Sequence, residues 1–339
     1  MTASPSAAGH AGTGSRSSRA TVAVVVVNHN AGATLDPFLR SVRAEPVTEV
    51  VVVDNASTDG SSDGVDADPI VRVVRTGTNL GYGSGANRGL ALVGADLVLV
   101  SNPDVTVHRG AVALLAAAFA ADPTLAIAGP CIRSAAGVRY PSARRFPSMT
   151  VAAGHVLLGL VAPQNRFSRR YRMAELDTAS PSPLSPGASS PAEPGTAEPG
   201  TAEPGIAEPG IGATAVDWVS GACFMARGRA LKELGGFDEA FFMYLEDVDL
   251  CWRAHRAGWR VAYVPGAEVT HVQGTSTARR PYRMLVAHHR SALLFARRST
   301  QGWRRATVPG VAVMLAVRLA VASTRQALGT LRKTAARAD

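Results

Sequence analysis

Unbroken apolar runs recur at short intervals along the first third of the chain. Thr21–Val27 is rich in valine, and Glu49–Val53, Ile70–Val74 and Leu97–Val100 are shorter runs of similar composition. Short apolar runs that end in polar loops predict strands buried on both faces of a sheet. We therefore predict four central strands in this region.

The segments between these runs have helical character. Ala33–Arg43 places its apolar side chains on one helical face, Tyr82–Val93 reads as a second helix, and Ala111–Ala121 is rich in alanine. Strands that alternate with helices predict a parallel sheet with helices on both faces. The predicted fold class is therefore α/β and Rossmann-like, with a ligand bound beyond the carboxyl ends of the strands.

The composition changes in the second half of the chain. Ala-Glu-Pro-Gly recurs at a period of five within residues 178–212. Proline opposes both helix and sheet, so we predict a disordered insertion there. After the insertion we predict a short helix at Leu231–Leu234, a longer helix at Phe241–Ala257 and a strand at Arg260–Val264.

The two ends of the chain differ from its centre. Residues 1–20 are rich in serine, alanine and glycine and have no apolar stretch, which predicts a disordered leader and argues against a secretory signal. No run reaches the roughly 18 apolar residues of a spanning helix. Val308–Ala322 comes closest and has basic flanks, so residues 301–339 are predicted to form a basic amphipathic segment on an anionic membrane surface. A C-terminal helix packed on the core is the alternative.

Charge and cysteine content restrict the class of protein. The 339 residues include 35 Lys and Arg against 26 Asp and Glu, a net charge of +9, which suits an anionic partner. The basic residues are not interleaved with aromatic residues on one face, which argues against nucleic acid. Cys131, Cys223 and Cys251 lack the spacing of a zinc site or a disulfide framework, and they fit a reducing, cytosolic compartment.

Polar residues directly follow three of the predicted strands. They are Asn28, Asp54 and the sequence Asn102-Pro103-Asp104. Asp104 has the chemistry to ligate the divalent cation that accompanies a nucleoside diphosphate, although Asn-Pro-Asp is also a common turn sequence. Asp54 suits hydrogen bonds from a base or ribose, or alternatively a loop and helix cap.

A glycine-rich segment, residues 79–89, precedes the fourth strand. It has neither the GxGxxG arrangement of dinucleotide sites nor the lysine of a P-loop. Its glycines would let the backbone approach a ligand, or let a helix pack closely on the sheet. Both interpretations remain open from the residues alone.

Three carboxylates, Glu246, Asp247 and Asp249, lie within four residues. On a helix Glu246 and Asp249 share a face, and Asp249 is spaced to pair with Arg253. Asp247 is then the candidate general base for an acceptor hydroxyl. A solvated run of charge is the alternative, but the apolar neighbours argue against full exposure. His271, after the last predicted strand, is either structural or a ligand of a divalent metal.

Seven segments occur in an order that resembles the family 2 glycosyltransferases with the GT-A fold. They are VVVVNHN, VVVDNASTDGS, NLGYGSGANRG, SNPD, WVSGACFMARG, GGFDEAFFMYLEDVDLCWR and GAEVTHVQGTS. The Asn-Pro-Asp form and the segment Arg139–Arg144 resemble the rhamnosyltransferase subgroup. The resemblance covers Thr21 to about Arg298, and it implies an inverting glycosyltransferase with a GT-A sheet and a C-terminal helical segment.

The resemblance also implies roles for individual residues. Asp247 would be the catalytic base, and Asp104 with His271 would bind Mg²⁺ or Mn²⁺. The nucleotide-sugar donor would be bound by Val27, Asn28, Asp54, Asn79, Gly81, Asn87, Asn102 and Asp104. The acceptor would be bound by Trp218, Gly221 and Glu246. Residues 21–130 would form the nucleotide-sugar-binding half, and residues 131–300 the acceptor-binding and catalytic half.

The substrates implied by the resemblance are dTDP-rhamnose and an N-acetylglucosamine linked to a polyprenyl diphosphate, used in cell-wall biosynthesis. The enzyme would be peripheral, at the cytoplasmic face of the plasma membrane. Alternatives are another donor, such as galactofuranose or a hexose, on the same scaffold, and a non-catalytic nucleotide-sugar-binding protein. The carboxylates Asp104 and Asp247 argue against the latter.

Two features depart from the family pattern. Asn102 stands where many relatives have a first aspartate. Asp104 is therefore expected to be the only acidic ligand that this motif contributes to a metal. The insertion at residues 178–212 is also atypical, and it has no evident chemical role.

Overall fold

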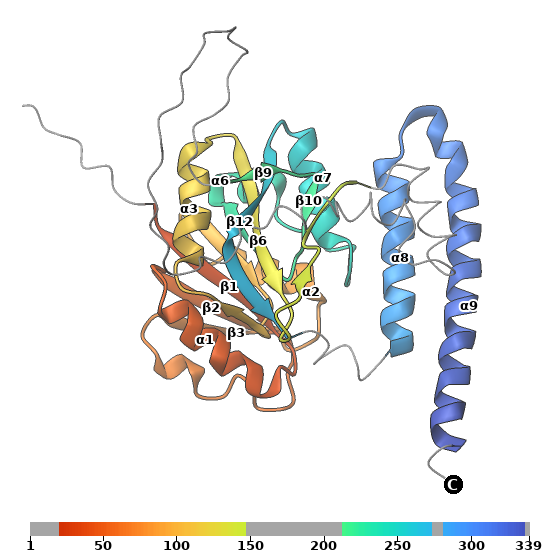
Figure 1. Cartoon of the computed structure of the whole chain (residues 1–339), viewed down its shortest axis with the longest axis horizontal. Coiled ribbons are helices and arrows are strands. Elements are labelled where there is room, and N and C mark those ends of the chain that lie inside the picture. Colours follow the sequence, from red (N-terminus) through yellow and green to blue (C-terminus); the bar gives the residue numbers. More distant parts are fainter. Residues whose placement is uncertain (1–19, 147–211, 273–280, 336–339) are drawn as a thin grey trace, which may run out of the picture.

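The structure is a computed structural model that describes residues 20–146, 212–272 and 281–335 (Figure 1). Its strands are β1 (Val22–Asn28), β2 (Glu49–Asp54), β3 (Val71–Arg75), β4 (Leu97–Ser101), β5 (Val105–Val107), β6 (Leu125–Arg133), β7 (Arg139–Tyr140), β8 (Ala143–Arg144), β9 (Thr214–Ala215), β10 (Trp218–Val219), β11 (Cys223–Arg227) and β12 (Arg260–His271). Its helices are α1 (Leu35–Arg43), α2 (Tyr82–Leu90), α3 (Ala111–Ala121), α6 (Gly228–Leu234), α7 (Glu246–Arg256), α8 (Pro281–Ser299) and α9 (Val308–Ala335). Short 3₁₀ turns are η1 (Gly32–Thr34), η2 (Val65–Ala67) and η4 (Gly302–Thr307).

The main sheet has the strand order β3-β2-β1-β4-β11-β6-β12-β5. The first four strands in this order run parallel, β11 lies antiparallel between β4 and β6, and β12 is parallel to β6. The predicted α/β fold with a mostly parallel central sheet is therefore confirmed. Because β6 crosses residue 130, the two predicted halves of the chain share this one sheet.

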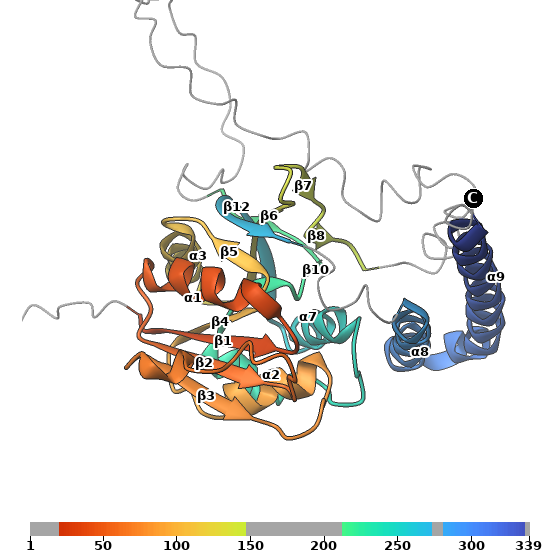
Figure 2. The ribbon, with the colours of Figure 1, turned by 90° about the horizontal axis from the view of Figure 1, so that it is seen from below.

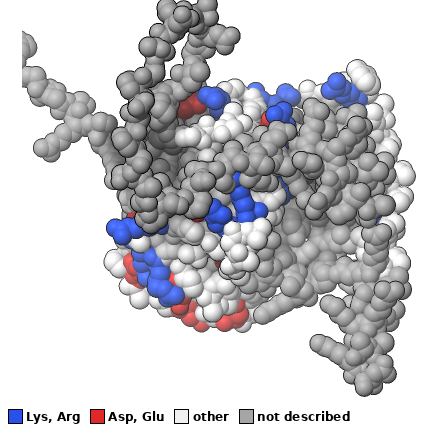
Figure 3. Space-filling view, viewed as in Figure 1, with Lys and Arg blue, Asp and Glu red and all other residues white. Residues whose placement is uncertain are grey.

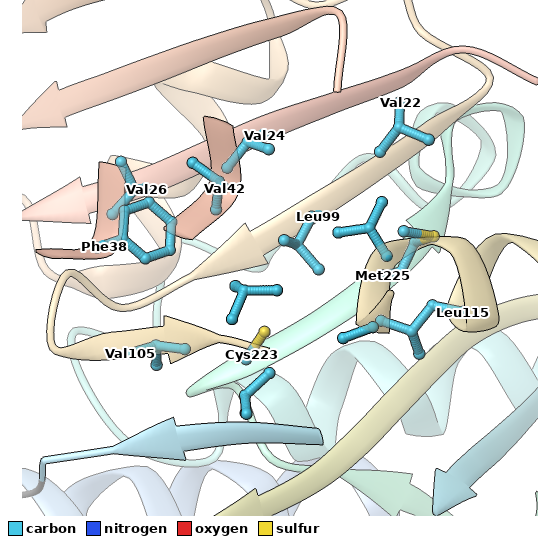
Figure 4. Packing of buried hydrophobic residues seen from close by; sticks show 14 of the residues in the cluster. Val22, Val24, Val26, Phe38, Val42, Leu99, Val105, Leu115, Cys223 and Met225 are labelled. Carbon is cyan, nitrogen blue, oxygen red and sulfur yellow. The ribbon is translucent and has the colours of Figure 1, made fainter. Parts of the chain in front are cut away.

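Alternate side chains of β1 fill two cores, one on each face of the sheet. Val22, Val24 and Val26 belong to the core that includes residues of α1 and α3, and Figure 4 shows Val26 beside Phe38, and Leu115 beside Met225. The other set of β1 side chains packs with residues of α2, α6 and α7. Every residue of β1 is buried, which explains its unbroken run of apolar residues.

The predicted helix at Phe241–Ala257 is wrong at its start. Helix α7 begins at Glu246, because Tyr244 and Leu245 have φ angles of 68° and 64°. Such left-handed backbone is strained for residues with a side chain, and it ends any helical continuation from the preceding residues. The chain therefore turns sharply just before the three carboxylates.

Two long helices, α8 and α9, form a hairpin beside the sheet. Figures 1 and 2 both place α8 nearer to the sheet and α9 on its far side. Gly302–Thr324 is a helical stretch of 23 residues with mean hydropathy 1.8, long and apolar enough to cross a membrane. The criterion of an uninterrupted apolar run does not detect this helix in the sequence. Only 6% of its most apolar part is buried inside the protein, so Gly302–Thr324 is not packed in the core.

Several sequence predictions fall outside the described residues. These are the leader up to residue 19 and the insertion from residue 178 to residue 211. The membrane-surface role of residues 301–339 stays a prediction. Figure 3 shows that the outer flank of the α9 side of the molecule is mostly uncharged, with basic groups near the top of the hairpin.

Candidate functional site

A cavity of about 930 Å³ lies at the carboxyl edge of the parallel strands, where the fold predicts a ligand. Its first wall comes from the strand ends and from the segment that enters α7. Its second wall comes from α8, η4 and α9. Of the predicted site residues, the ones that line it are Val27, Asn79, Gly81, Asn102, Asp104, Trp218, Gly221, Glu246, Asp247 and His271.

The predicted metal ligands Asp104 and His271 lie side by side. His271 Nε2 is 3.0 Å from Asp104 Oδ1, and both side chains are about nine-tenths buried, at 12% and 10% exposure. The pairing of β12 with β5 puts His271 opposite Val105, the residue after Asp104. Asn102 Nδ2 lies 3.4 Å from the same histidine nitrogen. Sheet pairing thus joins two residues that are far apart in the sequence.

Asp247 is held by backbone amides at the start of α7. Its Oδ2 accepts a hydrogen bond of 2.7 Å from the Gly221 amide, and its Oδ1 accepts one of 2.9 Å from the Val248 amide. Burial raises the pKa of Asp247, while the two amides and the positive charge of Arg144 oppose that rise. These donors stabilise the ionised form, which is the form that a base requires.

Glu246 has the opposite environment. Burial, and then the charge of Asp247, raise the pKa of Glu246 to about 8. Within the described residues its Oε2 is buried and has no hydrogen-bond partner. A pKa of about 8 means that Glu246 retains its proton at neutral pH, while the two amide donors favour the ionised form of Asp247.

Contacts of Tyr82 and Gly221 fix the position of Asp247. The Tyr82 hydroxyl donates a 2.7 Å hydrogen bond to the Gly221 carbonyl. A Cβ atom on Gly221 would lie 3.1 Å from the Cβ of Asp247, so a side chain there would displace the carboxylate. Burial raises the pKa of Tyr82 well above its ordinary value, which keeps its hydroxyl a donor. Gly221 thus contacts the predicted base directly, next to the predicted acceptor pocket.

The glycine-rich segment is explained by close packing at Gly81. Its φ is +87°, and a Cβ atom there would lie 2.1 Å from the Phe242 carbonyl oxygen. That same oxygen accepts a 3.0 Å hydrogen bond from the Tyr82 amide. Only glycine allows this approach, so Gly81 connects the amino end of α2 to the segment that enters α7.

Three predicted donor-site residues do not line the cavity. Asn28 is fully buried, and its side-chain amide donates to the hydroxyls of Ser57 and Ser61. Asn87 binds the backbone N–H and C=O of Phe237 at 2.9 Å each. The third residue is Asp54. Contact of these three with the donor stays a prediction, and in this structure they organise the loops around the cavity.

Asp54 orders the loop that follows β2. Its Oδ1 accepts from the Ser57 amide at 2.8 Å, and its Oδ2 accepts from the Ser62 hydroxyl at 2.6 Å. Burial alone would raise the pKa of Asp54, but these hydrogen bonds and the charge of Arg75 outweigh burial and lower it. Asp54 therefore acts here as an ionised carboxylate that orders this loop.

Arg144 is a cavity residue that the sequence did not single out. Its guanidinium lies 5.0 Å from the centre of the Trp218 ring and donates to the Tyr140 hydroxyl at 2.9 Å. Pairing of β8 with β10 brings Arg144 opposite Trp218. The one sequence feature that could have pointed to Arg144 is its place in the segment Arg139–Arg144, which resembles the rhamnosyltransferase subgroup. The whole wall formed by α8 and α9 was also missed.

A Rossmann-like sheet whose carboxyl edge carries Asp104 and His271, with the buried carboxylate of Asp247 on the same cavity, has the architecture of a GT-A glycosyltransferase. The chain matches the sequence profile of Glycosyl transferase family 2 over residues 23–181 and that of Glycosyltransferase like family 2 over residues 211–285. Together with the relative described next, these matches show that the chain belongs to glycosyltransferase family 2 and is a glycosyltransferase.

Two relatives and one solved structure illustrate the similarity. N-acetylglucosaminyl-diphospho-decaprenol L-rhamnosyltransferase of Mycobacterium tuberculosis is 36% identical over 297 residues, which are 84% of this chain and 86% of the relative. Pre-mycofactocin glycosyltransferase of the same organism is 29% identical over 74% of this chain and 42% of its own length. The mannosyltransferase PcManGT from Pyrobaculum calidifontis, solved with GDP-Man and Mn²⁺, has a TM-score of 0.52 and 17% identity, covering 95% of this chain and 81% of that one. This last similarity concerns the fold.

Proposed function

We propose that this glycosyltransferase moves L-rhamnose from dTDP-rhamnose to N-acetylglucosamine linked to a polyprenyl diphosphate, with inversion at the anomeric carbon. The observation that carries the proposal is the similarity to the mycobacterial rhamnosyltransferase along most of both chains. The cavity supports it, because one base, Asp247, lies on the same cavity as a candidate diphosphate site.

Asp104 and His271 are the residues that would hold Mg²⁺ or Mn²⁺. The buried Nδ1 of His271 has no hydrogen-bond partner in the described part of the chain, while its Nε2 faces Asp104. Two protein ligands suit a cation that takes its other ligands from substrate phosphate and water. When bound, the cation would stabilise the charge that develops on the leaving nucleoside diphosphate.

Asp247 would take the proton from the acceptor hydroxyl. Its burial and its two amide donors hold the carboxylate in one orientation, towards the cavity and beside Gly221. The neutral Glu246 next to it would donate a hydrogen bond to an acceptor oxygen, since a protonated carboxyl group is a donor. Attack by the deprotonated hydroxyl from the face opposite the leaving group gives inversion.

Association with the cytoplasmic face of the membrane belongs to the same proposal. A polyprenyl acceptor is held in the bilayer, and Gly302–Thr324 supplies a long apolar helix beside the cavity. Trp303, which is 80% exposed, and the basic residues of η4 suit the headgroup layer.

A donor panel tests the proposed substrates. Purified full chain would be incubated with polyprenyl-diphosphate-linked N-acetylglucosamine and dTDP-rhamnose, UDP-galactofuranose or UDP-hexoses. We expect product with dTDP-rhamnose and at least about a hundredfold less with the other donors, because pockets that hydrogen-bond a ligand discriminate strongly. Turnover with a UDP-sugar in place of dTDP-rhamnose would overturn the donor assignment.

A further inference from the structure

One part of the second wall of the cavity is a continuous stripe from the end of η4 along α9. The residues of this stripe are Thr307, Gly310, Val311, Met314, Leu315 and Arg318. They recur every three or four residues and therefore share one helical face. At about 1.5 Å per residue the stripe is about 16 Å long. On α8, residues between His288 and Ser299 form a facing stripe with similar spacing.

Arg318 is the one charged residue between Val308 and Thr324. It interrupts an otherwise apolar helix, and it points to the cavity-lining face instead of the outer face. Among the described residues it forms no ion pair. A charged residue in an apolar helix is costly unless it serves a polar partner, so its position marks a binding site for an anion.

Arg318 is the residue of the stripe whose charge acts on His288. Both residues line the cavity. The His288 ring in turn lies edge-on to Tyr244, with centroids 5.5 Å apart. Tyr244 leads directly into Glu246 and Asp247. The order along the cavity is therefore catalytic carboxylates, Tyr244 and His288, Arg318, and then the apolar stripe.

An acceptor of the proposed function presents its groups in the same order: sugar, diphosphate, isoprenoid chain. We propose that the groove between α8 and α9 binds the diphosphate and the first isoprenoid units of the acceptor, with Arg318 contacting the diphosphate. This inference rests on the proposed function for the identity of the lipid. An ordinary membrane phospholipid also has a phosphate followed by apolar chains, but it has no sugar that would reach Asp247 beyond the phosphate.

Gly310 provides a way to fill the groove without disturbing the fold. It lines the cavity, and a Cβ atom built on it meets nothing within 4 Å. Gly310→Leu would therefore place a side chain in the groove while improving the helix propensity of the segment. Val313→Leu adds a methylene on an exposed face of the same helix and is the matched control.

Binding of farnesyl diphosphate, a soluble prenyl diphosphate without sugar, tests the groove independently of catalysis. Titration calorimetry of the full chain would be run in EDTA, so that a metal-dependent donor site does not contribute. We expect Arg318→Gln and Gly310→Leu each to raise Kd about tenfold, the loss of one charge-assisted contact or of groove volume. Arg290→Gln, which removes an exposed charge from α8 outside the cavity, should leave Kd unchanged.

A parallel kinetic measurement separates this inference from the proposed function. Arg318→Gln should raise KM for the lipid acceptor about tenfold and leave KM for the donor unchanged. Failure of dTDP-rhamnose as a donor, with farnesyl diphosphate still bound at Arg318, would sink the proposed function alone. The groove assignment is overturned if farnesyl diphosphate binds no more tightly than inorganic diphosphate, or if Arg290→Gln and Arg318→Gln weaken binding equally.

Discussion

The two walls of the cavity are built by different physical means. On the sheet-edge wall the predicted catalytic groups have short polar contacts, such as the 2.7 Å bond from the Gly221 amide to Asp247. The wall formed by α8 and α9 is mainly apolar. It is attached by few polar contacts, among them the 2.9 Å bond from Ser291 to the Met243 carbonyl and the ion pair of Arg298 with Asp238.

The site divides its tasks between the two walls. Chemistry depends on geometry to within a fraction of an ångström, which strands and their neighbouring loops supply. Holding a flexible apolar chain depends on contact area and not on direction, which two packed helices supply. Substitutions on the sheet-edge wall should therefore change kcat, and substitutions on the helical wall should change acceptor affinity or membrane binding.

The largest effect is expected for Asp247→Asn. Loss of a positioned base should lower kcat by about 10³-fold or more, while the affinity for dTDP measured by calorimetry changes little. The amide side chain keeps the size of the carboxylate, so the fold should be retained. Substantial residual activity would mean that another residue is the base, and the chemical role proposed for the sheet-edge wall would fail.

Asp104→Asn should have the next largest effect. Loss of the one acidic side chain next to His271 should lower kcat by about 10²-fold and shift the metal activation curve to higher concentration. Asp96→Asn is the control. Asp96 is an exposed carboxylate just before the amino end of β4, whereas Asp104 follows the carboxyl end. Equal metal activation curves for the Asp104 variant and wild type would contradict the metal assignment.

On the helical wall, Val313→Ser combined with Val317→Ser should weaken binding to vesicles about tenfold. These side chains are 65% and 58% exposed and form an apolar outer surface of α9. Flotation with vesicles would measure the change, and kcat in detergent should stay at the wild-type value. Val138→Ser, at 66% exposure on the sheet domain, is the matched control. Unchanged flotation of the double variant would show that this face does not meet the membrane.

The smallest effect concerns pH and Glu246. Its folded pKa of about 8 lies above the ordinary value of 4.5, so the folded state holds the proton more tightly than the unfolded state. Stability linked to this group is complete below pH 4.5 and is lost as pH rises towards and through 8. Glu246→Gln has no carboxyl group to ionise, so the variant does not lose this stability. The Tm of the variant minus the Tm of wild type should therefore increase by a few degrees between pH 5 and pH 9.

Glu233→Gln removes an exposed carboxylate from α6 and serves as the control for the pH experiment. Its Tm difference from wild type should be constant over the same range. A Glu246 variant that followed the same flat course would mean that Glu246 is ionised in the folded protein at neutral pH, and the division of roles between Glu246 and Asp247 would fail.

Local patterns predicted the parallel part of the fold. The valine runs of β1 and β2 are long enough to be recognised alone, and the polar residues at their ends follow from chain order. The pairing of Asp249 with Arg253, read from helical spacing, is also confirmed, at 2.7 Å. These features depend on residues close together in the sequence.

Other features depend on distant pairing or on unusual backbone. The positive φ angles of Tyr244 and Leu245 leave no mark in the sequence, because neither residue is glycine. The contact of Arg144 with Trp218 requires β8 to meet β10 across the insertion. The Asp104–His271 pair was expected from family order and not from spacing, since only the sheet joins β5 to β12.

The contact of Gly81 with Phe242 has a consequence for protein engineering. It joins the segment around Asn79, a predicted donor-site residue, to the segment that carries Asp247, and Asn87 reinforces the junction through Phe237. A chimera that exchanges residues 79–90 with a relative of different donor preference would meet the wrong partner surface at residues 237–242. We expect donor preference to transfer only when residues 79–90 and residues 237–242 are exchanged together.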